Sequence, residues 1–168
     1  MSLTSAAGLA TVLSFVVFAM MAAWHAAPWL RSQPRVDALT ALVWINAFRH
    51  VALQIFAAQH FGFAVSDRAR DQIVAGDLIG MAVAVVAIAA LRFRARVAPF
   101  LVWTLVAETA LDLGYTTILG VQEHLYATAS AVTFLIDAFY VPLLWISVVL
   151  MAWQLYSRRD EPLAPARA

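Results

Sequence analysis

The sequence predicts an all-α integral membrane protein, a bundle of five transmembrane helices. Its residues are 64% hydrophobic and only 12% charged, and the mean hydropathy is +0.82. Apolar segments of about 20 residues recur, which is the length that a helix needs to cross the hydrocarbon core. Short connections join these segments, and no internal repeat divides the chain. We therefore expect one transmembrane domain over residues 1–156 and a disordered cytoplasmic tail over residues 157–168.

Five segments have the length and apolar character of spans. The first is expected to be a span and not a cleaved signal peptide, because no basic residue precedes its apolar run. The predicted spans are residues 3–27, 39–61, 72–91, 97–119 and 127–156.

Two local features modify these helices. Gly76, Gly80 and Ala84 stand at four-residue spacing in the third span, so another helix can approach closely, and we expect a homodimer contact through Gly76 and Gly80. Pro142 lies inside the fifth span, where it should free the carbonyl of Ala138 and kink the helix.

The arginines predict the orientation. Eight fall on one side of a five-span arrangement, against Arg68 and Arg70 on the other side. Because positive residues accumulate in the cytoplasm, the N-terminus should lie outside and the C-terminus in the cytoplasm. The alanine- and arginine-rich composition further suggests a bacterial inner membrane. The eight arginines are Arg31, Arg35, Arg92, Arg94, Arg96, Arg158, Arg159 and Arg167.

Composition also excludes several functions. The chain has no cysteine, which excludes disulfides, thiolate catalysis and cysteine metal ligands. It has no lysine, so no retinal or pyridoxal Schiff base can form. The net charge is +1 and no basic stripe is interleaved with aromatic residues, so we expect no nucleic-acid partner.

Ionisable residues inside the spans point to a functional site. Arg49 shares the predicted spans with Asp77, Glu108, Asp112 and Asp137. Each such residue costs about 2.5–3.5 kcal/mol at the centre of a membrane helix, so they should face inward and toward each other. Helical spacing places Arg49 on a polar stripe of the second span, Glu108 and Asp112 on one of the fourth span, and Asp137 on one of the fifth span. One arginine cannot neutralise four carboxylates, so we expect some acids to hold a proton that they can donate.

The leading hypothesis is a small membrane enzyme that performs acid–base chemistry, such as isomerisation or cyclisation, on a lipophilic, isoprenoid-like substrate. Glu108 or Asp112 would donate the proton, Asp137 would be the second acid–base group, and Arg49 would supply a fixed charge. No cofactor and no metal are expected. The candidate substrate-binding residues are Asn46, His50, Gln54, Asp77, Tyr115, Tyr140 and Trp145.

Other functions stay open at this point. Intramembrane carboxylates with an arginine also suit a proton- or cation-coupled transporter or channel. The chain could equally be a non-catalytic subunit of a membrane complex, with Arg49 in a purely structural ion pair. Haem binding is disfavoured because His50 has no second histidine at its depth, and a surface metal site near His60, Glu123 and His124 is a further alternative.

In length and number of spans the chain resembles the five-helix translocator protein and the membrane domain of sterol isomerases. The segments "ETALDLGYTTILG" and "IDAFYVPLLWIS" contain no motif of those families. The resemblance implies only that a bundle of this size can enclose a lipophilic ligand.

Overall fold

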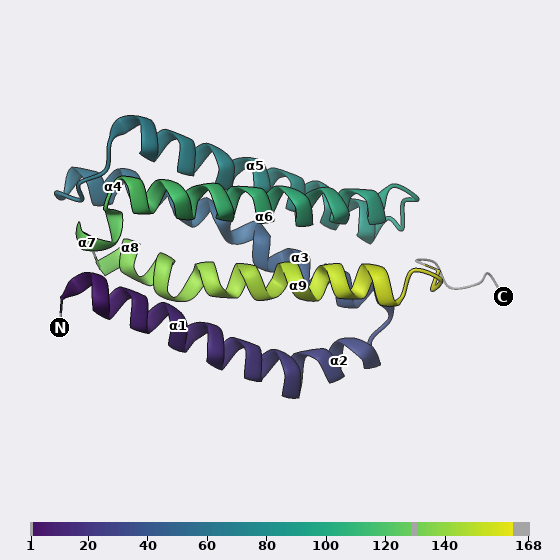
Figure 1. Ribbon diagram of the computed structural model, residues 1–168. Helices are drawn as coiled ribbons and strands as arrows, with labels where there is room; N and C mark the ends of the chain where they lie inside the picture. Colours follow the sequence, from purple (N-terminus) through teal and green to yellow (C-terminus); the bar gives the residue numbers. More distant parts are fainter. Residues whose placement is uncertain (1, 129–130, 163–168) are drawn as a thin grey trace.

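Five long helical rods lie side by side in the structure, a computed structural model that describes residues 2–128 and 131–162 (Figure 1). Within these residues the regular structure is entirely helical. The elements are α1 (Leu3–Met21), η1 (Ala22–Ala26), α2 (Ala27–Ser32), α3 (Arg35–Ala47), η2 (Phe48–Leu53), α4 (Gln54–His60), α5 (Asp67–Arg92), α6 (Ala98–Gln122), α7 (Leu125–Thr128), α8 (Ala131–Leu135), η3 (Ile136–Tyr140) and α9 (Val141–Ser157).

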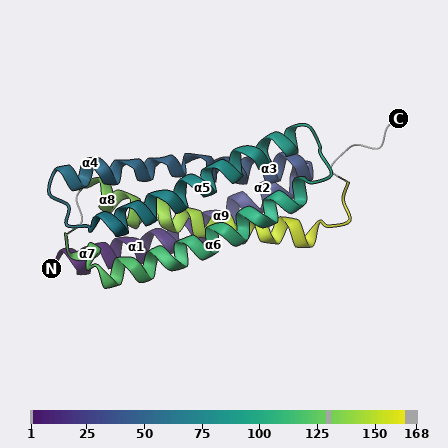
Figure 2. The ribbon, with the colours of Figure 1, turned by 90° about the horizontal axis from the view of Figure 1, so that it is seen from above.

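Four of these rods are long and apolar enough to cross a membrane, which supports a membrane location. They are Leu3–Ser32, Arg35–His60, Asp67–Arg92 and Ala131–Ser157. Helix α6, the predicted fourth span, has 25 residues and is not among these four. Residues 129 and 130 of the predicted fifth span lie outside the described residues. Helix α1 begins at one end of the bundle and α9 ends at the other (Figure 2).

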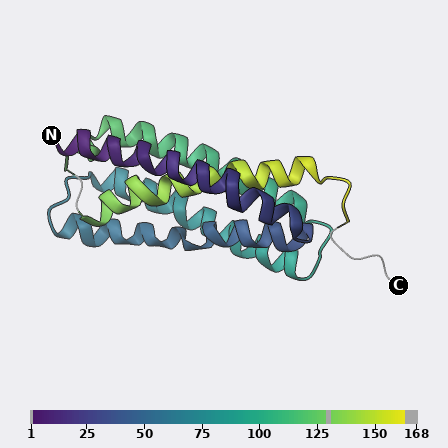
Figure 3. The same ribbon diagram turned by 90° about the horizontal axis from the view of Figure 1, so that it is seen from below.

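Helix α9 has the most central position in the bundle. It packs against α1, α3 and α6, while α5 packs against α3 and α6. Helix α1 lies at the edge, where it contacts η3, α9 and α7 (Figure 3). One side of α1 therefore has no long helix covering it.

Two apolar clusters fill the bundle on either side of its middle. The larger lies toward the C-terminal end of the chain and includes Leu39, Val102 and Met151, all fully buried. The smaller lies toward the opposite end and includes Ile55 and Phe63. Close van der Waals packing stabilises such clusters in a membrane, where lipid tails are as apolar as the side chains. The polar residues of the middle lie between these two clusters.

Three of the rods contain turns that are not α-helical. The 3₁₀ turns of η2 rotate the chain by about 120° per residue, against about 100° in an α-helix, and they include Arg49. The π-helix η3 includes Asp137, and the N–H of Val141 at its end bonds to the carbonyl of Ile136. Pro142 follows directly. The predicted disturbance near Pro142 thus takes the form of a π-helix, a feature that is frequent at functional sites.

Two arginines fasten the C-terminal end of α9 to the turn between α2 and α3. Arg158 donates to the carbonyls of Leu30 and Gln33 at 3.1 and 2.9 Å. Arg35 donates to the carbonyls of Arg159 and Glu161 at 3.3 and 2.9 Å. Residues 158–161 of the predicted disordered tail are therefore held against the bundle, and residues 163–168 lie outside the described part of the chain.

Candidate functional site

The guanidinium of Arg49 lies at the centre of the site and is fully buried. Its Nε donates to Asp77 Oδ1 at 2.8 Å and its Nη1 to Glu108 Oε2 at 2.7 Å, while Nη2 bonds to Asp112. Nη1 also donates to Thr109 Oγ1 at 3.1 Å. The overwound turns of η2 thus carry the cation, and α5 and α6 carry the three carboxylates. The structure brings together four of the five ionisable residues that the sequence places in one pocket.

Two glycines of α5 make room for this cluster. A Cβ atom added at Gly80 would overlap the Arg49 guanidinium and crowd the Glu108 carboxylate. A Cβ atom added at Gly76 would overlap the Asp112 carboxylate. The four-residue spacing of these glycines therefore admits side chains of the same chain. A homodimer through Gly76 and Gly80 stays a prediction, and Gly80 itself is buried.

Buried polar side chains continue from the arginine toward α9. Thr109 Oγ1 donates to Asn46 Oδ1 at 3.3 Å, and Asn46 Nδ2 donates to Ser147 Oγ at 3.2 Å. All three side chains are buried. Asn46, a predicted substrate-binding residue, thus connects Thr109 beside the cluster to Ser147 of α9. The sequence reasoning missed Thr109, and its position next to Glu108 was the available signal.

The cluster holds more negative than positive charge. Three carboxylates share one guanidinium, so two negative charges lack a countercharge within the cluster when all the acids are ionised. Isolated charge is expensive away from water. An excess of carboxylates over cations is an arrangement that suits both acid–base catalysis and ion coupling.

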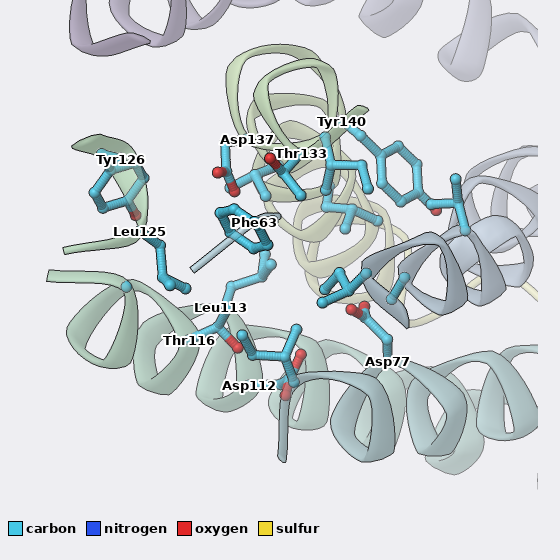
Figure 4. Close-up of a pocket in the computed structure, with 18 residues that line it drawn as sticks. Phe63, Asp77, Asp112, Leu113, Thr116, Leu125, Tyr126, Thr133, Asp137 and Tyr140 are labelled. Atoms are coloured by element: carbon cyan, nitrogen blue, oxygen red, sulfur yellow. The ribbon is translucent and has the colours of Figure 1, made fainter. Parts of the chain in front are cut away.

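A largely apolar cavity of about 60 Å³ lies next to the cluster. Asp77 and Asp112 line one wall, and Asp137 with Thr133 lines the opposite wall (Figure 4). Within the described residues, Asp137 has neither an ion-pair partner nor a hydrogen bond. The cavity thus separates a carboxylate held by Arg49 from one that no charged group holds.

Aromatic side chains complete the cavity wall. Phe63, Tyr126 and Tyr140 all line it. The hydroxyl of Tyr140 donates to the carbonyl of Ile45 at 2.8 Å, which fixes the ring. Burial, followed by the negative charge of Asp137, raises the pKa of Tyr126 in the short helix α7. The sequence reasoning missed Phe63 and Tyr126, because they come from a loop and a short helix.

Besides Asn46, three predicted substrate-binding residues lie outside this cavity. Gln54 is exposed on α4, and His50 is exposed, with Nδ1 3.2 Å from the carbonyl of Ala47. Tyr115 is half exposed and its hydroxyl donates to Gln72 Oε1 at 3.0 Å. The 3₁₀ winding of η2 turns Gln54 roughly 100° further around the helix relative to Arg49 than uniform α-helical spacing does. Trp145, a fourth predicted residue, lines a separate groove.

Metal binding finds little support in the described residues. No group of three or more histidine and acidic side chains among residues 2–128 and 131–162 is arranged to hold a metal ion. Glu123, named above as one ligand of an alternative surface site, accepts a hydrogen bond from Ser66 Oγ at 3.0 Å. That contact joins the end of α6 to the start of α5.

Fold and site together define an all-helical protein with four helices apolar enough to cross a membrane and an arginine–carboxylate cluster at its centre. The chain belongs to the family described as "Domain of unknown function (DUF8737)", whose model matches residues 6–156. Neither the curated proteins nor the solved structures include a match to the chain.

Proposed function

We propose that the protein is a small membrane enzyme that performs acid–base chemistry, isomerisation or cyclisation, on a lipophilic, isoprenoid-like substrate. One observation supports this above all. Asp112 and Asp77 face Asp137 across a cavity whose remaining lining is mostly apolar. Two acid–base groups on opposite sides of an apolar space can add and remove a proton at two atoms of one bound molecule.

We further propose that α6 also crosses the membrane, which makes five spans, with the N-terminus outside and the C-terminus in the cytoplasm of a bacterial inner membrane. At about 1.5 Å per residue its 25 residues extend about 37 Å, enough for a hydrocarbon core of about 30 Å. Glu108 and Asp112 bond to Arg49 inside the bundle, so their charges do not face lipid. The distribution of arginines supports the orientation.

Each charged residue has a distinct role in this proposal. In an isomerisation, a carboxyl group on one wall adds a proton to a double-bond carbon, and the carboxylate on the opposite wall removes one from a neighbouring carbon. The substrate thus keeps its composition while its double bond moves. Asp112 and Asp137 are the two groups, and Arg49 holds Asp112 in place. The faces of Phe63 and Tyr140 stabilise the positive charge that develops.

Glu108 has a less direct role than the sequence suggested. Its carboxylate bonds to Arg49 and Thr109, and it does not line the cavity. It balances the guanidinium charge, which leaves Asp112 as the acid of α6 that meets the substrate.

Two features weigh against the alternatives. A transporter needs a path on both sides of the site, yet fully buried apolar residues such as Leu39, Val102 and Met151 fill the half of the bundle toward the C-terminal end. A non-catalytic subunit would leave its polar face for another protein, yet Asp77, Glu108 and Asp112 bond to Arg49 of their own chain.

The proposal is tested by the lipophilic molecules that co-purify with the mildly solubilised protein, separated by chromatography and identified by native mass spectrometry. We expect the wild type to carry two species of equal mass that differ as isomers. The variants Asp137→Asn and Asp112→Asn should bind the same molecule but carry one isomer only. Asp37→Asn, which changes an exposed acid of α3, is the matched control and should keep both. An unchanged isomer ratio in Asp137→Asn, or a wild type free of any such molecule, would overturn the proposal.

A further inference from the structure

A groove of about 360 Å³ runs along the outside of the bundle beside the cavity. Its walls come from α1, α6 and the rod formed by η3 and α9. Thr11 and Phe15 contribute from α1, Gly114 and Thr117 from α6, and Trp145 from α9. Trp145, a predicted substrate-binding residue, thus lines this groove and not the cavity.

Groove and cavity have a wall in common. Five residues line both, namely Leu113, Thr116, Tyr126, Asp137 and Val141. Asp137 is the only acidic residue among them. The carboxylate that no charged group of the described chain holds therefore lies between the inner cavity and the outer groove.

The two volumes differ in what they can contain. Sites for small organic molecules measure about 300–1,000 Å³. The cavity, at about 60 Å³, is too small for the body of a lipophilic molecule, whereas the groove, at about 360 Å³, falls within that range. A ligand that reaches Asp137 must therefore have most of its atoms in the groove.

The groove reaches the surface of the bundle, because Thr117, which lines it, is exposed. Helix α1 packs against η3, α9 and α7. Its Leu9, Val12 and Val16 are exposed, so this rod faces lipid when the chain is in a membrane. On the α6 side, a Cβ atom added at Gly114 would meet nothing within 4 Å. Gly114 thus leaves empty the space that any larger residue would occupy.

We propose that the substrate reaches the site sideways from the bilayer through this groove. Its hydrocarbon chain lies between α1 and α6 along Phe15, Gly114 and Trp145, and its reacting end meets Asp137. The inference rests on the proposed function for the identity of the ligand as substrate. It adds the substrate class: a molecule with one reactive end and a long hydrocarbon chain that stays in contact with the membrane.

The groove can be tested by fluorescence quenching, because Trp145 lines it. A variant that keeps Trp145 and has phenylalanine at the other five tryptophans is reconstituted in phosphatidylcholine vesicles with brominated acyl chains. We expect bromine to quench Trp145, and Gly114→Phe to reduce this quenching at least twofold by filling the groove. The five replaced tryptophans are Trp24, Trp29, Trp44, Trp103 and Trp153.

Two controls separate the groove from general lipid exposure. Gly8→Phe makes the same change at an exposed glycine of α1 with open space around it, and should leave the quenching of Trp145 unchanged. A second single-tryptophan variant that keeps Trp103, which is 44% exposed on α6, should be quenched equally with and without Gly114→Phe. Gly114→Leu replaces Gly114→Phe if the larger residue prevents the protein from eluting as a folded species.

Absent quenching of Trp145, or quenching that Gly114→Phe and Gly114→Leu leave unchanged, would overturn the inference. The measurement follows an acyl chain and involves no reaction. A quenched Trp145 together with an unchanged isomer ratio in Asp137→Asn would defeat the proposed chemistry and keep the groove. An unquenched Trp145 together with a changed isomer ratio in Asp137→Asn would support the proposed chemistry and overturn the groove.

Discussion

Two buried arginines in this chain are held in different ways. Arg49, in the middle of the bundle, is fully buried and bonds to three carboxylates. Arg35, at the end of the bundle, is 7% exposed and bonds to main-chain carbonyls, and its Nε has no partner among the described residues. The carbonyls it meets include that of Leu155 in the last turn of α9, where helices favour positive charge.

The difference shows that the partners a buried arginine needs depend on its position along the bundle. Near the end of the bundle, carbonyl dipoles suffice for Arg35. In the middle, Arg49 needs full countercharges, and the cluster supplies more of them than one cation uses. That surplus of carboxylates is what a simple structural ion pair would lack, and the proposed acid–base chemistry depends on it.

The largest expected effect is on stability. Replacing Arg49 should lower the free energy of unfolding much more than replacing Arg35. Arg49→Leu leaves three carboxylates without their cation and should lower the free energy of unfolding by about 3–5 kcal/mol. Arg35→Leu removes bonds to carbonyls that water can partly replace, and should cost about 1–2 kcal/mol. Thermal unfolding in detergent, followed by gel filtration, measures both.

A combined variant sharpens this test. Adding Glu108→Gln and Asp112→Asn to Arg49→Leu removes two of the uncompensated charges and should recover part of the lost stability. If the combined variant is no more stable than Arg49→Leu alone, the carboxylates are not what makes the loss of Arg49 costly.

Close packing around Arg49 predicts the next effect in size. Gly80→Ala pushes a methyl group into the space of the guanidinium and should destabilise the protein by about 1–3 kcal/mol. Gly114→Ala, also in a helix but with open space around it, should stabilise it by about 0.5–1 kcal/mol. Opposite signs in the same unfolding assay are the expected result, and a stabilising Gly80→Ala would contradict the close packing.

The smallest expected effect is the pH dependence of the contact between Arg158 and Glu161, at the end of the bundle where Arg35 lies. The hydrogen bond from Arg158 lowers the pKa of Glu161 below its ordinary value of about 4.3. The contact therefore contributes in full above that value and is lost as pH falls through the lowered pKa. Amide hydrogen exchange of residues 158–162 should be slower in the wild type than in Glu161→Gln near about pH 6, with the difference vanishing near about pH 3. A difference that persists in acid would contradict this role.

Much of this arrangement could be predicted from the sequence. Charged residues are costly inside a membrane helix, so their presence there indicates that they meet inside the bundle. Arg49, Asp77, Glu108 and Asp112 were expected to meet, and they do. Asp137 lines the same cavity without joining their bonds. Helical spacing failed for Gln54, because it assumed α-helical winding through the 3₁₀ turns of η2.

Contacts that depend on tertiary packing lay beyond the sequence. Nothing local marks Tyr126 in α7 as part of the cavity, and the spacing of Gly76 and Gly80 fits an intermolecular contact as well as a place for Arg49. Composition predicted the long helices. It could not show that α6 depends on Arg49, a residue of another rod, to hold its carboxylates Glu108 and Asp112.

That dependence has a consequence for how the protein is made. Arg49 lies on a rod that leaves the ribosome before α5 and α6, which carry all three of its carboxylates. Each of these charges costs about 2.5–3.5 kcal/mol if its helix enters lipid alone. On the proposal that α6 also spans the membrane, we predict that the second, third and fourth rods are released into the bilayer together and not one by one.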